Sequence, residues 1–275
     1  MMTQALSSGV YPVTAQNLLL YRVRAFDAYP NLTHAIFTRQ GGYSQAPFDT
    51  LNLGSSVGDD PQAIKKNYEQ VYQVTHITPE QTVSCHLIHS ADVLTINQAN
   101  QQRLMGKADG LVTGTPNIYL SMRFADCTPL IFFDPVRGAV GLTHAGWRGT
   151  MQDMAGATVR MMVKQFDCRP GDMIAVIGPA IGPCCYEVGP EVMAAAAENF
   201  EDSASLFTRW NGKANHAHFN LWEANRRQLA AAGVQQIIQS ELCTACRTDQ
   251  FFSHRAEQGR TGRFGVIIGL RGTPA

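Results

Sequence analysis

The sequence predicts an α+β fold: a single domain of mixed or antiparallel β-sheets with helices packed on the outside. Short apolar runs of strand length outnumber the helical segments, and two of these runs flank the turn sequence Asp134–Gly138, which predicts a hairpin. Strands that follow one another in pairs before a helix argue against a strict βαβ alternation. No repeat, linker or shift of composition divides the 275 residues. We therefore expect a flexible polar tail over residues 1–16 and one domain over residues 17–275.

Four helices are expected. From Pro61 to Val74 the apolar side chains fall on one face, and proline suits the first helical turn. From Thr150 to Phe166 they recur with a period of about 3.6 residues. Residues 190–199 and 221–232 are the other two segments. Gly233 follows the last of them, as a left-handed helix end requires.

Nine strands are expected from short apolar runs rich in branched and aromatic residues. They are Thr33–Thr38, Gln81–His86, Val93–Asn97, Ile118–Arg123, Leu130–Asp134, Ala139–His144, Met173–Ile177, Gln236–Ser240 and Arg263–Leu270. In this arrangement Cys127 lies just after one strand, and Pro129 ends the hydrogen bonding of that strand. His144 is the last residue of another strand.

Composition excludes several classes of function. The formal net charge is +0, so no overall field attracts nucleic acid or an anionic membrane. No apolar run approaches the roughly 18 residues of a spanning helix. The first residues lack the cationic and apolar regions of a secretory signal, so we expect a cytoplasmic protein whose seven cysteines are mostly reduced.

Three possible metal ligands lie on separate segments: His89, Cys127 and His144. Two imidazoles and one thiolate can hold zinc and leave the fourth position open, as a catalytic zinc requires. Their spacing matches no zinc finger, and spacing alone favours a buried thiol with two unrelated histidines. The small residues Ala145-Gly146 beside His144 shift the balance toward a site, because they let the backbone approach a ligand closely.

Arg39, Arg148 and Arg255 are candidate anion-binding residues. The first two stand beside glycines, and Arg148 precedes a helix expected to start near Thr150. Guanidinium groups suit bidentate binding of phosphate or carboxylate, although each of these residues taken alone is more consistent with an ordinary surface arginine. Trp147 offers a ring face that could stack on a planar substrate.

Two further patterns are weaker. Cys243-x-x-Cys246 could be half of a zinc site or a redox pair, but no second Cys-x-x-Cys pair completes it, so we expect no metal there. His216-Ala217-His218 could bind copper, but it lies in a polar stretch expected to be a loop. The Gly/Pro-rich run Gly178–Glu187 follows a strand and is either a wall of a site or a rigid structural loop.

Together these segments resemble one family, the YfiH/YlmD-like proteins, long labelled laccase-domain or polyphenol oxidase proteins and now viewed as purine nucleoside phosphorylases. The resemblance runs in order from about residue 33 to residue 270. It is carried by Thr38-Arg39-x-Gly-Gly, Leu51-Asn52-Leu53-Gly54, Ala108-Asp109-Gly110, Ala125-Asp126-Cys127-x-Pro129, His144-Ala145-Gly146-Trp147-Arg148-Gly149, Gly178-Pro179 through Gly189, Cys243-Thr244 and Phe252-Ser253-x-Arg255 with Gly262-Arg263.

The resemblance implies a YfiH-like fold and a zinc enzyme of purine nucleosides and phosphate. The family's zinc ligands fall on His89, Cys127 and His144. The implied activities are phosphorolysis of adenosine, inosine, guanosine and methylthioadenosine, and deamination of adenosine. Cys127, Asp126 and Arg148 are then the expected catalytic residues, with Arg39, Arg148, Arg255 and Trp147 binding substrate or phosphate. Ala256 departs from the family, which often has a second arginine there.

Three other functions stay open at this point. A copper-dependent polyphenol oxidase would use copper instead of zinc, but a blue-copper site gathers its ligands within one short loop. A metal-free hydrolase would use Cys127 as nucleophile and His144 as base. A purine-binding module without turnover is the third.

Overall fold

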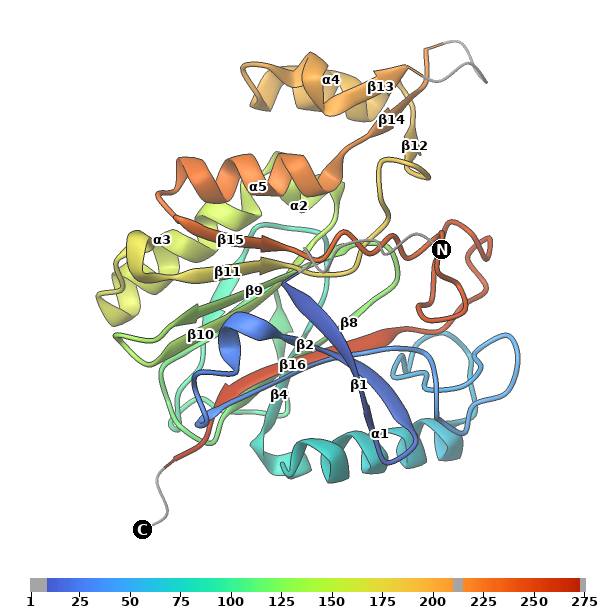
Figure 1. Ribbon diagram of the computed structural model, residues 1–275, viewed down its shortest axis with the longest axis vertical. Coiled ribbons are helices and arrows are strands. Elements are labelled where there is room, and N and C mark those ends of the chain that lie inside the picture. The colour runs from blue at the N-terminus through green and yellow to red at the C-terminus, as the bar shows by residue number, and fades with distance from the viewer. Residues whose placement is uncertain (1–8, 210–214, 273–275) are drawn as a thin grey trace, which may run out of the picture.

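Two stacked β-sheets form the centre of the protein, with helices on both outer faces (Figure 1). The computed structural model describes residues 9–209 and 215–272. The predicted α+β architecture is confirmed. The larger sheet has the order β1-β2-β3-β16-β8-β4-β6. Its strands are β1 (Val10–Ala15), β2 (Leu18–Val23), β3 (Leu32–Phe37), β16 (Phe264–Leu270), β8 (Tyr119–Phe124), β4 (Thr82–His86) and β6 (Leu104–Lys107).

The second sheet has six strands in the order β15-β11-β9-β10-β7-β5. They are β15 (Gln236–Gln239), β11 (Ile174–Ile177), β9 (Thr128–Asp134), β10 (Ala139–Ala145), β7 (Gly110–Thr113) and β5 (Val93–Thr95). The predicted hairpin joins β9 to β10, with Asp134 opposite Ala139 and His144 opposite Pro129. Both sheets mix parallel and antiparallel pairs.

Three apolar layers hold the sheets and helices together. The central layer takes side chains from both sheets, such as Ile36 and Ile131. Helices α3 (Met154–Phe166) and α5 (Leu221–Ala231) cover the outer face of the six-stranded sheet. Helix α1 (Pro61–Thr75) covers the larger sheet, and its first turn is capped by the Asp60 carboxylate, which accepts a hydrogen bond from the N–H of Gln62. Burial of these apolar faces is the main stabilising contribution.

A small third sheet and one helix form the upper part of the molecule in Figure 1. The sheet has the order β12-β14-β13, and helix α4 (Pro190–Asn199) packs beside it. Its strands are β12 (Glu187–Val188), β13 (Phe207–Arg209) and β14 (Ala217–Phe219). The short helix α2 (Trp147–Met151) directly follows β10 and packs against this part. Four 3-10 turns complete the described elements: Arg24–Phe26, Pro79–Gln81, Pro170–Asp172 and Ser203–Leu206.

All nine expected strands are present, but four expectations are wrong in part. Residues 10–15 of the supposed tail form β1, because a two-residue turn pairs Ala15 with Leu18; residues 1–8 lie outside the described part. The helix expected over 150–166 is two helices, α2 and α3, because Asp153 takes a left-handed conformation and caps the second. Pro129 lies inside β9 instead of ending the preceding strand. Residues 217–219 are a strand and not a loop.

No helix among the described residues is long and apolar enough to cross a membrane.

Candidate metal centre and its cavity

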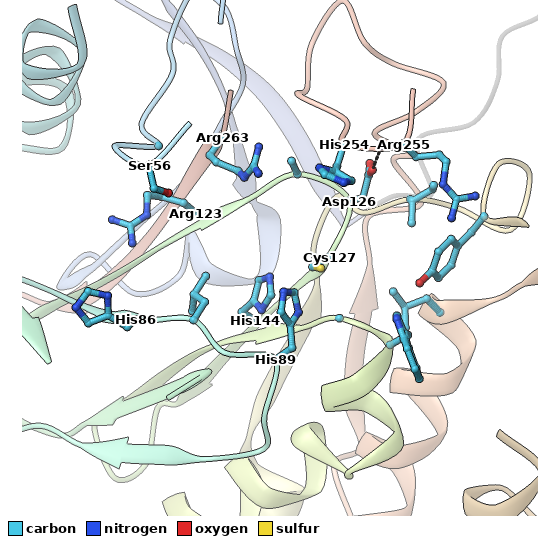
Figure 2. Close-up of a pocket in the computed structure, with 18 residues that line it drawn as sticks. Ser56, His86, His89, Arg123, Asp126, Cys127, His144, His254, Arg255 and Arg263 are labelled. Atoms are coloured by element: carbon cyan, nitrogen blue, oxygen red, sulfur yellow. Dashed lines mark hydrogen bonds between the residues drawn. The ribbon is translucent and has the colours of Figure 1, made fainter. Parts of the chain in front are cut away.

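Three separate elements bring His89, Cys127 and His144 together. His89 lies in the connection between β4 and β5, Cys127 in the turn between β8 and β9, and His144 in β10. One ligand atom from each residue lies within 4.8 Å of the other two. Figure 2 shows the two imidazoles and the sulfur turned toward a common point. The convergence expected from the sequence is therefore present.

The turn that carries Cys127 crosses from one sheet to the other. Asp126 takes a left-handed backbone conformation there, with φ of 83°. Its carboxylate accepts hydrogen bonds from the Thr244 hydroxyl at 2.6 Å and from the N–H of Arg255 at 2.7 Å, one on each oxygen. Such a conformation is costly for a residue with a side chain and persists only when neighbours hold it. These bonds therefore fix the backbone from which the Cys127 thiol projects.

A buried carboxylate, Asp109, orients both histidines. One of its oxygens lies 3.0 Å from Nδ1 of His144. The other accepts hydrogen bonds from the backbone N–H groups of Ser90 and Ile88, on either side of His89. Burial opposes ionisation of Asp109, but the bonds from His144 and from these N–H groups outweigh it and hold its pKa at about 2. With Nδ1 of His144 donating to this carboxylate, Nε2 is left to face Cys127.

The thiol of Cys127 and the imidazole of His144 favour each other's charged forms. Burial raises the pKa of the thiol, yet the adjacent His144 and His89 reverse this and lower it. Burial likewise lowers the pKa of His144, but Cys127 and Asp109 raise it overall. A metal binds the thiolate but only the neutral imidazole, so an ion that binds here must release the proton of His144.

Gly146 leaves the space that a metal ion on these donors would need. A β-carbon at this position would lie 2.9 Å from Sγ of Cys127 and 3.1 Å from Nδ1 of His89. Any side chain would therefore press on two of the three donors. One thiolate and two imidazoles, with a carboxylate behind one of them, also match the donors and second-sphere partner typical of zinc. The residues present thus fit a zinc ion.

A cavity of about 590 Å³ opens over these donors. Among the described residues, three arginines and one carboxylate line it: Arg123, Arg255 and Arg263, with Asp126. In Figure 2, Arg123 and Arg263 lie on one side of Cys127 with Ser56, and Arg255 lies on the other side. The remaining lining includes large apolar and aromatic side chains: Leu87, Trp147, Ile181, Tyr186 and Leu221. A ligand with a planar apolar part and an anionic part matches this lining.

Two of the expected substrate-binding residues, Trp147 and Arg255, line the cavity. The Arg255 guanidinium donates a hydrogen bond to the backbone oxygen of Glu187 at 2.8 Å and lies 5.4 Å from the centre of the Tyr186 ring. Arg148 is not among the lining residues. Its half-exposed side chain lies over the Trp147 ring and pairs with Glu191 at 3.5 Å.

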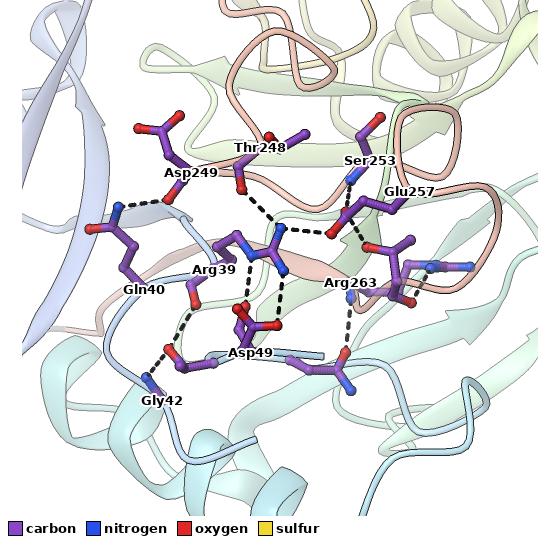
Figure 3. Close-up of polar contacts among 12 residues, drawn as sticks. Arg39, Gln40, Gly42, Asp49, Thr248, Asp249, Ser253, Glu257 and Arg263 are labelled. Atoms are coloured by element: carbon purple, nitrogen blue, oxygen red, sulfur yellow. Dashed lines mark hydrogen bonds and ion pairs between the residues drawn. The ribbon is translucent and has the colours of Figure 1, made fainter. Parts of the chain in front are cut away.

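Arg39 also lies apart from this cavity, and its guanidinium is already engaged (Figure 3). It donates hydrogen bonds to the backbone oxygens of Asp49 at 2.7 Å and Thr248 at 2.8 Å, and to the Glu257 carboxylate at 2.8 Å. The guanidinium is also stacked 4.4 Å from the Phe252 ring. The structure thus shows Arg39 joining loops outside this cavity.

Several lining or supporting residues were not predicted: Asp109, Arg123, Tyr186 and Arg263. Asp109, Tyr186 and Arg263 stand in segments that carried the family resemblance, but nothing in the sequence showed what their side chains contact. Arg263 is partly buried, and burial lowers its pKa. Its contribution could be inferred only once β16 was seen beside β8.

Known proteins resemble this chain over most of its length. The family model described as multi-copper polyphenol oxidoreductase laccase matches residues 33–271. The chain belongs to this family. Purine nucleoside phosphorylase YlmD of Geobacillus stearothermophilus is 38% identical over 243 residues, which cover 85% of this chain and 88% of that protein. Purine nucleoside phosphorylase YfiH of Escherichia coli is 31% identical over 233 residues, covering 85% and 91%.

Solved structures show the same fold within the family. The crystal structure of YlmD from Geobacillus stearothermophilus superposes with a TM-score of 0.89 at 34% identity, covering 96% of this chain and all of that one. The YfiH protein of Bacillus licheniformis gives a TM-score of 0.86, also at 34% identity. The YfiH-like fold that the resemblance implied is therefore confirmed, and relatives in the family are named as enzymes of purine nucleosides.

Proposed function

We propose that this chain is a zinc-dependent purine nucleoside phosphorylase that also deaminates adenosine. The observation that carries the proposal is the convergence of His89, Cys127 and His144 at a cavity lined by arginines and aromatic side chains. Relatives over most of the chain bear the name purine nucleoside phosphorylase. Adenosine, inosine, guanosine and methylthioadenosine are the proposed substrates, together with phosphate.

Phosphorolysis joins a phosphate oxygen to the anomeric carbon of the ribose as the bond from that carbon to the purine nitrogen breaks. Arg123 and Arg263 would bind the phosphate, because they lie together on one side of the donors. The anion needs no reorganisation of the protein when two cationic groups already face it. Trp147 and Tyr186 would hold the purine by its ring faces.

Deamination replaces the amino group on carbon 6 of adenosine by oxygen from water and releases ammonia. A zinc ion on His89, Cys127 and His144 would supply Lewis-acid chemistry and lower the pKa of water near the substrate. The residues of the chain do the rest: Asp109 holds His144 in one tautomer, and Asp126 holds the Cys127 turn in place. We therefore assign Asp126 a positioning role within the proposed mechanism.

The test is incubation of the purified protein with adenosine, with and without phosphate, followed by chromatography. We expect adenine and ribose 1-phosphate only when phosphate is present, and inosine in its absence. Cys127→Ala should lose both activities. Cys168→Ala, a buried cysteine outside the cavity, is the matched control and should keep them. Phosphorolysis at the parental rate by Cys127→Ala would show that the zinc-centred proposal is wrong.

One observation favours a second candidate, a metal-free hydrolase. Cys127 lies beside His144, and His144 lies beside Asp109, which is the arrangement of a nucleophile, its base and a carboxylate that orients the base. This candidate leaves His89 without a role, although its imidazole is part of the cluster. Zinc bound in stoichiometric amount, with Cys127 protected from alkylation until a chelator is added, would decide against it.

The family description favours a third candidate, a copper-dependent polyphenol oxidase. Among the described residues, the two groups able to hold a metal do not include His216 or His218, the His-x-His pattern that several coppers would need. Metal analysis of protein purified without added copper, combined with an assay for phenol oxidation, separates this candidate from the zinc enzyme.

A further inference from the structure

A second cluster of metal-binding side chains lies outside the catalytic donors. It consists of Cys184, Cys185, Cys243 and Cys246, whose sulfur atoms all lie within 4.8 Å of one another. Sγ of Cys246 is 3.4 Å from that of Cys184 and 3.3 Å from that of Cys185. A disulfide bond is about 2.05 Å long, and all four are free thiols in the structure. The sequence contains Cys243-x-x-Cys246 without a second Cys-x-x-Cys pair, but the structure brings the adjacent residues Cys184 and Cys185 beside it.

Two tight turns present these sulfur atoms, and the backbone fixes each turn. In the first, the N–H groups of Cys185 and Tyr186 donate to the carbonyl of Gly182 at 3.0 Å. In the second, the N–H of Arg247 donates to the carbonyl of Cys243 at 3.1 Å. The four sulfur atoms are therefore brought together by local structure that does not depend on contact among them.

Backbone hydrogen bonds also join the two turns to each other. The N–H of Ala180 donates to Leu242 at 3.2 Å, and the N–H of Thr244 donates to Ala180 at 3.1 Å, which makes a parallel bridge between Ala180 and Cys243. A site whose ligands are already in place needs little ordering of the chain when the ion binds.

The size and chemistry of the cluster select the ion. Zinc–sulfur bonds of about 2.3 Å in a tetrahedron separate the sulfur atoms by about 3.8 Å. The two distances from Cys246, 3.3 and 3.4 Å, are slightly shorter than this, and all four sulfur atoms lie within 4.8 Å of one another, so small side-chain shifts would seat the ion. Four soft sulfur donors select zinc over magnesium or calcium, and a complete set of four is typical of a structural site. The N–H of Gly182 also donates to Sγ of Cys243 at 3.2 Å, which favours the thiolate form.

We propose that Cys184, Cys185, Cys243 and Cys246 bind one structural zinc ion, separate from the catalytic donors. Each thiol that becomes a ligand releases its proton to solvent, and the ion then joins the loop after β11 to the loop after β15. Entry is open, because Cys184 and Cys246 are exposed. This inference does not rest on the proposed function.

The ion would support one wall of the catalytic cavity. Ile181 and Tyr186, on the first loop, line that cavity. On the second loop, Thr244 donates to the Asp126 carboxylate beside Cys127. Removal of this zinc should therefore loosen the cavity wall without removing any of the three catalytic donors.

The experiment measures zinc per chain by elemental mass spectrometry in protein purified without added metal. We use Cys127→Ala as the background, so that only the four-cysteine cluster is counted. It should retain one zinc ion per chain. Adding Cys184→Ser and Cys246→Ser, both at exposed positions, should remove that ion. Adding Cys168→Ser instead is the matched control and should leave it bound.

A second measurement uses the unmodified chain and needs no variant to fold. Mass-spectrometric mapping of alkylation should show Cys184, Cys185 and Cys246 protected until a strong chelator is added. Substitution by cobalt should give the intense charge-transfer absorption of several thiolate ligands. Equal zinc in the serine variant and its background would overturn the proposal, as would rapid alkylation without chelator or a disulfide within the cluster.

Discussion

Oδ1 of Asp109 lies 3.0 Å from Nδ1 of His144. The same carboxylate binds the backbone on both sides of His89, so one buried side chain positions two of the three proposed ligands. Partners of this kind fix the tautomer and orientation of a ligand, and they matter for metal affinity almost as much as the ligands do.

Asp109→Asn should weaken zinc binding at His89, Cys127 and His144 by about 10- to 100-fold and leave the four-cysteine cluster unaffected, because the neutral amide cannot accept all of these hydrogen bonds or favour the same tautomer of His144. Competition with a chromophoric chelator measures the affinity. Asp134→Asn is the matched control: Asp134 is also buried and accepts two backbone N–H groups, but it lies in the β9–β10 turn. Similar zinc affinities in the two variants would contradict the role given to Asp109.

Gly146→Ala should expel the zinc ion proposed on His89, Cys127 and His144, leaving only the ion of the four-cysteine cluster, while the fold is retained. The new methyl group would lie 2.9 Å from the Cys127 sulfur and 3.1 Å from His89, closer than ordinary van der Waals contact. Zinc content and a circular dichroism melt of the same sample report the two effects separately. Gly106→Ala provides the comparison, since its methyl group would meet no atom within 4 Å. Full zinc occupancy in Gly146→Ala would argue against an ion held by these donors.

Arg123→Gln should raise KM for phosphate and lower kcat/KM by about 100-fold, because removing a preorganised cation from a transition-state anion typically costs that much. Steady-state kinetics with varied phosphate at saturating adenosine measures the effect. A change in KM for adenosine alone would place phosphate elsewhere.

Arg39→Gln is the control for that experiment and tests the structural role of Arg39. It should leave KM for phosphate unchanged but lower the free energy of unfolding by about 2 to 4 kcal/mol, since it leaves Glu257 without its buried partner. Urea unfolding provides that value. A raised KM for phosphate with normal stability would restore the phosphate contact expected from the sequence.

His34 should make the fold sensitive to acid. Its Nε2 accepts a hydrogen bond from the N–H of Val23, and burial lowers the pKa of the imidazole to about 3. The unfolded chain binds a proton near pH 6.5 and the folded chain does not until about pH 3, so stability falls as the pH drops through this window. The loss is about 1.4 kcal/mol per pH unit at most.

Urea unfolding at several values between pH 7 and pH 4 measures this slope. His34→Gln keeps an acceptor for Val23 but cannot titrate, so its slope should be shallower. Arg22 raises the cost of protonating His34 further, because its charge is of the same sign. Identical slopes in the parent and His34→Gln would show that other groups cause the acid sensitivity.

The sequence predicts local structure well wherever the signal is local. All nine expected strands exist because each is an apolar run bounded by turn residues. The β1–β2 hairpin was missed because its turn is Gln16-Asn17, which lacks the usual glycine, and because Pro12 weakens the strand pattern. The break between α2 and α3 depends on the conformation of Asp153, which apolar periodicity does not reveal.

Site residues follow the same rule: the sequence indicates those with distinctive neighbours, but it does not indicate their distant partners. Cys127 and His144 stood out through their neighbours, and the structure brings both to His89. Arg39 stood out equally through its glycines, yet Glu257, 218 positions away, engages its guanidinium. Contacts between residues so distant in the sequence are determined by the packing of the whole fold. The proximity of Cys184 and Cys185 to Cys246 could not be predicted for the same reason.

The crossing from β8 to β9 takes only the three residues Ala125, Asp126 and Cys127. Cys127 is therefore attached to both sheets, and the pairing of β9 with β10 keeps it beside His144. Slippage of one sheet over the other would strain this short turn and displace the thiol from the other ligands. Substitutions deep in the shared core, far from substrate, should thus weaken metal retention well before they unfold the protein.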